Sequence, residues 1–344
     1  MKKIFLISLI VITLLILALT CYADDLSNTI LSGKRIRWLV PSTSIGGDSY
    51  GTAEVVCRYL GEVLNLNAKV DAIGTKSFDE LLKAKPDGTT IVQSHDMIFL
   101  GVLFGAYTED WNLENYRIGP RVAINPGACF AARIDAPYND LVEMAQYLKD
   151  NPNETIRVPV EAGSTSHIAY VAYYNWVSDN YGKDVADRLR VVIFGSTSEK
   201  LQALWDGQSD IIFADIGSIE QYTLEGVENR LKLKWLAFLD EVEGYDSYTM
   251  AEQGITLEGK PFTFSKEFLI YLPKDTPQEV VDALDAAMEI VSKDEKFLDE
   301  FKKRYYKCGF LPSEEAEKYI LEKRAIMKRL IENAPNLDEL TTVK

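Results

Sequence analysis

Two stretches of the chain share one design, in which an apolar strand ends in a loop of glycine and hydroxyl residues that opens a helix. The first stretch is 40–50 and the second is 158–167. A helix start presents unpaired N–H groups and a partial positive charge, so it attracts carboxylate or phosphate. Because the two starts are far apart in the sequence, they predict two lobes that close on one small anion.

Length and charge narrow the kind of protein. A chain of 344 residues suits two domains better than one. Its formal charge of −15 argues against a nucleic-acid partner, which needs a basic surface. The same charge repels an anion at long range, so an anion site has to act through local dipoles. Solubility alone also accounts for the acidic balance.

The segment 1–23 has the pattern of an export signal. Two lysines follow the first residue, an apolar run covers 4–20, and small residues suit a cut before Asp24. Two alternatives stay open: the run of 17 residues is retained as a membrane anchor, or Cys21 carries a lipid. In each case we expect the protein in the periplasm or on the extracytoplasmic face of the cell membrane.

Three cysteines follow the export signal, and they are scattered. Without a closely spaced pair they do not predict a metal site, and we expect neither a metal nor a cofactor. Cys57 lies on the apolar face of a predicted helix and Cys129 in a predicted strand, where each serves as a small core residue.

Strands and helices alternate along the chain. Short runs rich in valine, isoleucine and aromatic residues, each beside turn residues, predict ten strands: 34–40, 68–72, 89–94, 117–124, 128–133, 155–160, 190–194, 210–214, 234–239 and 264–272. Helical periodicity fills the intervals, and 277–333 is helical and free of strands. This order predicts an α/β fold of mostly parallel sheets with helices on both faces.

Prolines near 119–127 mark a point where the chain crosses from one lobe to the other. A second crossing lies near 233–240. We expect a discontinuous first lobe, 24–122 plus 238–344, and a second lobe, 123–237. Two crossings form a hinge, and closure of a hinge around a ligand is a known two-lobe motion.

Five segments carry a resemblance to a known family: 46–50 (GGDSY), 83–91 (KAKPDGTTI), 162–167 (AGSTSH), 204–210 (LWDGQSD) and 234–238 (KWLAF). Together, and in this order, they resemble the solute-binding receptors of the tripartite tricarboxylate transporter family, the Bug receptors. The resemblance covers nearly the whole chain after the export signal. The sequence departs from the family in three places: Thr52 replaces the usual arginine, the first loop is one residue short, and the glycine turn at 73–74 is reduced.

The resemblance implies a type II periplasmic-binding-protein-like fold with a ligand cleft between its lobes. It implies a small carboxylate held by backbone N–H groups, hydroxyls and water rather than by an arginine clamp. The two glycine loops, which contain no arginine or lysine, suit this mode. The implied partners are the carboxylate and the integral membrane permease subunits of the transporter, with no nucleic acid, and we expect a monomer.

The candidate ligand-binding residues come from these loops and from two strand ends. They are Ser44, Gly46, Gly47, Asp48, Ser94, Gly163, Ser164, Thr165, His167 and Asp215. The glycines either let the backbone approach an anion or form a turn at positive φ. The hydroxyls either donate to the ligand or cap the helix.

The acidic and imidazole candidates have alternatives of their own. Asp48 and Asp215 either cap a helix or accept a hydrogen bond from a ligand amine or hydroxyl. If both carboxylates face the ligand, an amino-substituted acid fits. His167 either orders its loop or contacts the ligand. His95 follows a strand end, where α/β sheets bind ligands, but a helix cap explains it equally, and Ser94 is the better candidate there.

Three functions compete. The receptor reading has the two anion loops, the export signal and the family resemblance behind it. A sensory module of the same fold differs only in its partner. A secreted hydrolase would use Ser164 and His167, but Ser164 does not stand in a G-x-S-x-G elbow, so we expect no enzyme.

Overall fold

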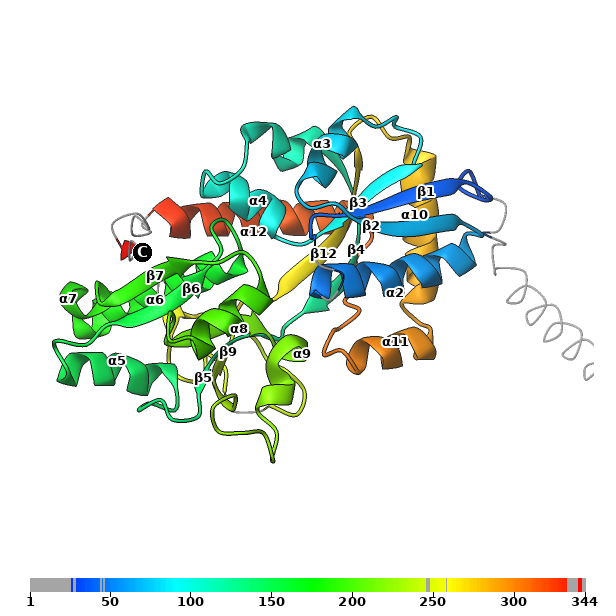
Figure 1. Ribbon diagram of the computed structural model, residues 1–344. Helices are drawn as coiled ribbons and strands as arrows, with labels where there is room; N and C mark the ends of the chain where they lie inside the picture. Colours follow the sequence, from blue (N-terminus) through cyan, green and yellow to red (C-terminus); the bar gives the residue numbers. More distant parts are fainter. Residues whose placement is uncertain are drawn as a thin grey trace, which may run out of the picture.

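The strands of the protein fall into two groups that lie side by side, each covered by helices (Figure 1). The computed structural model describes residues 26, 29–43, 45, 47–245, 248–257, 259–332 and 340–341. The predicted export signal, with Cys21, lies outside the described residues, as do the candidates Ser44 and Gly46. Among the helices of the described part, none has the length and apolar character needed to cross a membrane.

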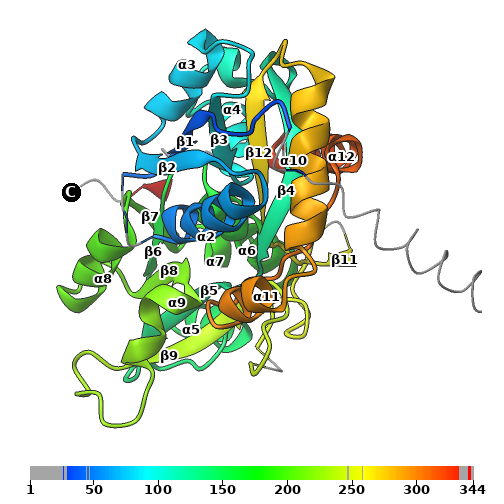
Figure 2. The same ribbon diagram turned by 90° about the vertical axis from the view of Figure 1, so that its right-hand side faces the viewer.

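The first lobe contains a five-stranded sheet in the order β2 (Asn67–Ala72), β1 (Arg35–Val40), β3 (Thr90–Ser94), β12 (Lys266–Pro273) and β4 (Tyr116–Asn125). Successive side chains of β1 point to opposite faces of the sheet. Trp38 packs in one core with α2 (Asp48–Val63) and α10 (Gln278–Val291), which lie toward the viewer in Figure 2. Leu39 packs in the other core with α3 (Lys76–Lys83), α4 (Met97–Leu103) and α12 (Ser313–Glu332). The sheet is therefore buried on both faces.

The second lobe is built on β5 (Ala128–Arg133), which pairs with β8 (Ile211–Asp215) and β9 (Leu233–Phe238). Beside β8 lies the parallel pair β6 (Ile156–Val160) and β7 (Leu189–Ile193), since the Asp210 N–H donates to the Arg157 carbonyl at 3.0 Å. The helices of this lobe are α5 (Leu141–Asp150), α6 (Thr165–Tyr181), α7 (Lys183–Ala186), α8 (Thr197–Trp205) and α9 (Ile216–Ile219).

Helix α6 is buried along most of its length although it contains four tyrosines. Burial of a hydroxyl requires a hydrogen-bond partner. The Tyr170 hydroxyl donates to the Leu189 carbonyl and the Tyr173 hydroxyl to the Leu141 carbonyl, each at 2.7 Å. These bonds fix α6 between β7 and α5, and so they fix the position of its N-terminus.

All ten predicted strands are present, each within two residues of its expected ends. In the described part of 277–333 the regular elements are α10, α11 (Glu295–Lys302) and α12. Cys57 and Cys129 are buried, as expected. A short hairpin, β10 (Thr256–Leu257) with β11 (Lys260–Pro261), was not expected.

The expected strand direction is wrong. Parallel pairing holds for β1 with β2 and β3 and for β6 with β7, whereas β12 and β5 run antiparallel to both of their neighbours. The reason is the crossing between the lobes. Strand β4 continues through Pro126 and Gly127 directly into β5 without an intervening helix, so the βαβ rule that makes neighbours parallel does not apply there.

The return to the first lobe takes place at β12. Before it, the Trp176 indole of α6 donates to the Gly254 carbonyl at 3.0 Å, and the Gln253 amide donates to the Leu236 carbonyl at 2.7 Å. The predicted lobe boundaries, 122/123 and 237/238, stay predictions. These contacts favour a second boundary at Lys266.

The two lobes touch beside α4. Gly163 has φ +76°, and a Cβ placed there would lie 2.8 Å from the Gly101 Cα and 3.0 Å from the Ala106 Cβ. Next to it the Phe104 and His167 rings stack with their centroids 3.5 Å apart. The lobes are therefore closed against each other at this point, and only glycine fits at position 163.

We predict that Gly163→Ala holds the lobes apart. Alanine at this φ costs about 1–2 kcal/mol, and its methyl group also collides with the backbone of α4. Gly207→Ala is the matched control, because Gly207 has φ +67° but nothing within 4 Å of its Cβ position. Small-angle scattering should show a larger radius of gyration for Gly163→Ala than for the wild type. The radius of gyration of the control should equal that of the wild type. Equal radii for both variants would contradict the steric argument.

Candidate functional site

A cleft of about 690 Å³ lies between the lobes and is lined by residues of both. The first lobe contributes the turn after β1, His95 after β3, and Tyr107. The second lobe contributes the segment before and at the start of α6, the start of α8, and Asp215. Strand ends and helix starts thus meet here, as they do in other open α/β sheets that bind ligands.

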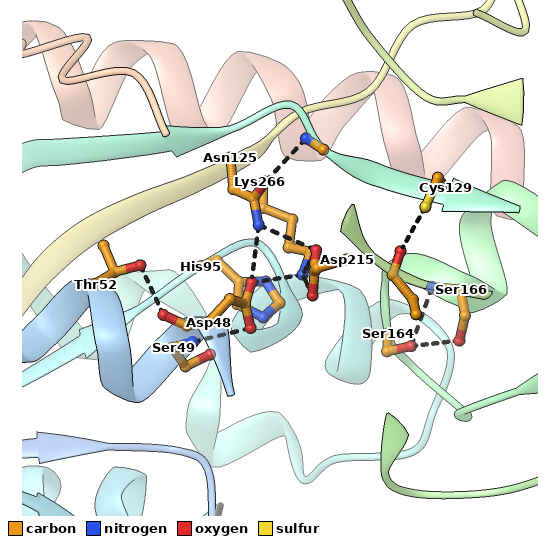
Figure 3. Close-up of polar contacts among 12 residues, drawn as sticks. Asp48, Ser49, Thr52, His95, Asn125, Cys129, Ser164, Ser166, Asp215 and Lys266 are labelled. Carbon is orange, nitrogen blue, oxygen red and sulfur yellow. Dashed lines mark hydrogen bonds and ion pairs between the residues drawn. The ribbon is translucent and has the colours of Figure 1, made fainter. Parts of the chain in front are cut away.

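The start of α6 presents hydroxyl groups to the cleft. Ser164 is the N-cap, and its Oγ accepts from the Ser166 N–H at 3.2 Å and lies 2.8 Å from the Ser166 Oγ (Figure 3). The Thr165 hydroxyl is buried and has no hydrogen-bond partner among the residues that the structure describes. A buried hydroxyl without a partner is costly, so Thr165 is available to a ligand atom.

A buried ionic cluster closes the hinge side of the cleft (Figure 3). The Lys266 ammonium lies 2.6 Å from a carboxylate oxygen of Asp48 and 2.6 Å from one of Asp215. The Asn125 amide also donates to both carboxylates, at 3.2 Å and 3.0 Å. Asp48 begins α2, Asp215 ends β8, and Asn125 and Lys266 lie on β4 and β12 next to the crossings. The cluster therefore ties the two lobes at their connection.

One lysine cannot neutralise two carboxylates, and the pKa values show the consequence. Burial alone would raise the pKa of Asp48, but the nearby Lys266 charge overrides it and lowers that pKa to about 2. Burial and the charge of Asp48 together raise the pKa of Asp215 to about 6. Burial opposes the charge of Lys266, yet the two carboxylates raise its pKa well above the usual range. At neutral pH the cluster keeps a net negative charge.

Two further charged side chains line the cleft without an ion pair among the described residues, although the Lys200 ammonium lies over the Phe213 ring at 6.0 Å from its centroid. Lys200 of α8 is 5% exposed, and among the described residues its ammonium makes no hydrogen bond or ion pair. Burial lowers its pKa, against the pull of Glu161. Burial raises the pKa of Glu161, which follows β6, and its carboxylate likewise has no hydrogen bond or ion pair within the described part of the chain.

Half of the predicted site residues line this cleft: Gly47, Asp48, Ser164, Thr165 and Asp215. Gly163 lies at the adjoining contact between the lobes. Ser94 is fully buried, and its hydroxyl donates to the His95 carbonyl at 3.2 Å. His167 Nδ1 accepts the Gly163 N–H at 3.2 Å, so this ring orders its own loop. Contact of each predicted residue with a ligand stays a prediction.

His95 lines the cleft in place of Ser94. Its Nδ1 accepts the Met97 N–H at 3.3 Å, so it also orders the start of α4. Burial lowers the pKa of His95 to about 4, and the charge of Lys266 acts in the same direction. The ring is therefore neutral at pH 7.

We expected backbone N–H groups and hydroxyls rather than cationic side chains to hold the ligand, and that stays a prediction, but Lys200 and Lys266 both line the cleft. The two glycine loops indeed carry no lysine, but other elements do. The sequence offered one signal: Lys200 shares a helix face with the buried Leu204, four residues on. A lysine on an apolar face is unusual. Asn125, Lys266 and Glu161 gave no comparable signal.

Two α/β lobes with a polar cleft at their crossing define a two-lobe solute-binding protein. The model of the family described as "Tripartite tricarboxylate transporter family receptor" matches residues 51–336, and the chain belongs to this family. The resemblance found in the sequence is thereby confirmed. The family consists of receptors, so the chain is a binding protein and not an enzyme.

Solved structures show the same fold. The periplasmic binding protein BugD has a TM-score of 0.68 at 20% identity, with 90% of this chain and 99% of that chain covered. Rpa4515 of R. palustris with adipate has a TM-score of 0.71 at 16% identity, with 87% of this chain and 96% of that chain covered. MatC of Rhodopseudomonas palustris with bound malate has a TM-score of 0.67 at 18% identity, with 87% of this chain and 99% of that chain covered. The comparison with curated proteins finds no match.

We predict that Lys266→Met lowers the free energy of unfolding by about 3–5 kcal/mol at pH 7, because it leaves two buried carboxylates without their counter-ion. Lys293→Met is the control, since Lys293 is 70% exposed and pairs with Glu289 on the surface. We expect the control to change stability by less than about 1 kcal/mol. Urea denaturation measures both. Equal losses would show that the cluster does not carry this energy.

A second prediction concerns pH. The pKa of Asp215 is raised from 3.8 to about 6 in the folded protein. Its proton stabilises the folded state below pH 3.8, and this contribution is lost as pH rises through about 6. Relative to Asp215→Asn, the wild type should therefore lose up to about 3 kcal/mol between about pH 4 and about pH 7.

Urea denaturation at several pH values compares the two proteins. The pKa of Asp48 is lowered from 3.8 to about 2, so its contribution to stability changes only between these pH values, below the window compared here. Parallel pH profiles of the two proteins would contradict the assignment of the raised pKa to Asp215.

Proposed function

We propose that this protein is an extracytoplasmic receptor that captures a small carboxylate between its lobes and delivers it to the permease subunits of a tripartite transporter. The observation that carries the proposal is a buried Lys200, without an ion pair in the described part of the chain, in a cleft that the start of α6 also lines. Family membership supports the transport role. The relatives with bound malate and adipate support a carboxylate as ligand.

The two helix starts of the second lobe differ in their availability. At α8, the Glu199 carboxylate already accepts the N–H groups of Gly195 and Ser196, at 3.1 Å and 3.0 Å. A ligand anion would have to displace it. At α6 no carboxylate of the described residues occupies the helix start, and none of them pairs with the Thr165 hydroxyl. A carboxylate between α6 and Lys200 thus gains both a helix dipole and a cation.

Closure of the lobes completes the site. We propose that the first lobe is 24–122 plus 238–344 and the second lobe is 123–237. The contacts of 248–257 with the second lobe favour a later second boundary, at Lys266. From the first lobe, Gly47 and His95 would then reach the ligand held by the second. The protein would be exported by the segment 1–23 and act as a monomer in the periplasm, either free or held by a lipid on Cys21.

We predict that Lys200→Met weakens carboxylate binding by about 10- to 100-fold, the range for a lost charge-assisted hydrogen bond. Calorimetric titration with succinate, malate, adipate and citrate measures the affinity. Lys183→Met is the control, because Lys183 lies in the same lobe, 73% exposed and paired with Asp187. If a broad panel of di- and tricarboxylates, aromatic acids and amino acids neither binds nor raises the melting temperature, the proposed function fails.

A further inference from the structure

We propose that the natural ligand is an amino-substituted carboxylic acid, whose carboxylate meets Lys200 and whose ammonium group meets Glu161. This inference rests on the proposed function and deepens it by naming the class of ligand. It is carried by two charged side chains of opposite sign that line one cleft, belong to one lobe, and both lack an ion pair or hydrogen bond among the described residues.

The charge of the cleft favours such a ligand over a plain dicarboxylate. Among the described residues that line it, three carry carboxylates, Asp48, Glu161 and Asp215, and two carry ammonium groups, Lys200 and Lys266. His95 is neutral, because burial lowers its pKa to about 4. The formal charge of these groups is therefore −1, and burial of Glu161 and Lys200 shifts the pKa of each toward its neutral form. A dicarboxylate adds two more negative charges in a buried space, whereas its amino-substituted counterpart adds one and a monocarboxylic amino acid adds none.

Glu161 is the acid that remains free for an ammonium group. The carboxylates of Asp48 and Asp215 are already bound by Lys266 and Asn125 (Figure 3). The sequence-based idea that these two acids receive a ligand amine is therefore replaced by Glu161. A partly buried carboxylate without a partner is unfavourable, and an ammonium group supplies the missing donors and charge.

Lys200 and Glu161 do not neutralise each other. Their charges act on each other, but no ion pair within 4.0 Å joins them among the described residues. Each is thus left to one end of a molecule that carries both charges. The free hydroxyl of Thr165, buried at the α6 start, adds a donor on the carboxylate side.

The test uses matched pairs of acids that differ in one amino group: L-aspartate and succinate, L-glutamate and glutarate, L-alanine and propionate. Calorimetric titration of the wild type should show at least one amino acid binding tenfold or more tightly than its unsubstituted partner. Glu161→Gln, which keeps the shape and removes the charge, should weaken that amino acid at least tenfold and leave the unsubstituted acid within threefold.

Glu154→Gln is the control, because Glu154 lies exposed in the same lobe away from the cleft. Lys200→Met should weaken both acids of a pair. If the unsubstituted acids bind the wild type as tightly as the amino acids do, this inference is overturned and the proposed function stands. This outcome does not depend on whether Glu161→Gln folds. An unchanged preference in a folded Glu161→Gln would also overturn it. No binding by either class would overturn the proposed function itself.

Discussion

The ammonium group of Lys266, shared by the carboxylates of Asp48 and Asp215, is the interaction on which the arrangement of the lobes depends. Each partner comes from a different place: the start of a first-lobe helix, the end of a second-lobe strand, and the strand that returns between them. Since all three side chains are largely buried, none finds a substitute partner in water. The cluster therefore fixes the hinge end of the cleft, and it leaves behind the negative charge that any ligand then meets.

The groups best suited to bind a ligand lie mainly on one lobe. Ser164, Thr165, Lys200 and Glu161 all belong to the stretch of chain that follows β6 and ends with α8. The first lobe approaches them through α4, close enough that Gly163 admits no side chain. A ligand would thus load on the second lobe and become enclosed when the first lobe closes over it. The stacked rings of Phe104 and His167 stabilise that closed arrangement next to the cleft rather than inside it.

The sequence predicted the strands and the two loops well because each is a local property. A run such as Ile211–Asp215 needs only its own apolar residues and neighbouring turns to be recognised. Strand direction depends on which strand pairs with which, and the prolines near 119–127 signal a crossing without showing which strands pair on either side of it. The ionic cluster was out of reach for the same reason. Asn125 and Lys266 are ordinary polar residues at strand ends, and only the fold brings them together.

The position of Lys200 would let a strongly acidic protein hold the proposed carboxylate. The formal charge of −15 opposes a negative ligand at a distance, but salt screens that field over about 10 Å. A buried ammonium group is screened far less, and its own burial cost falls when a carboxylate arrives. The helix dipole of α6 acts over the same short range. Local dipoles alone were expected to do this work, and the structure adds a cation placed where the long-range repulsion no longer decides the outcome.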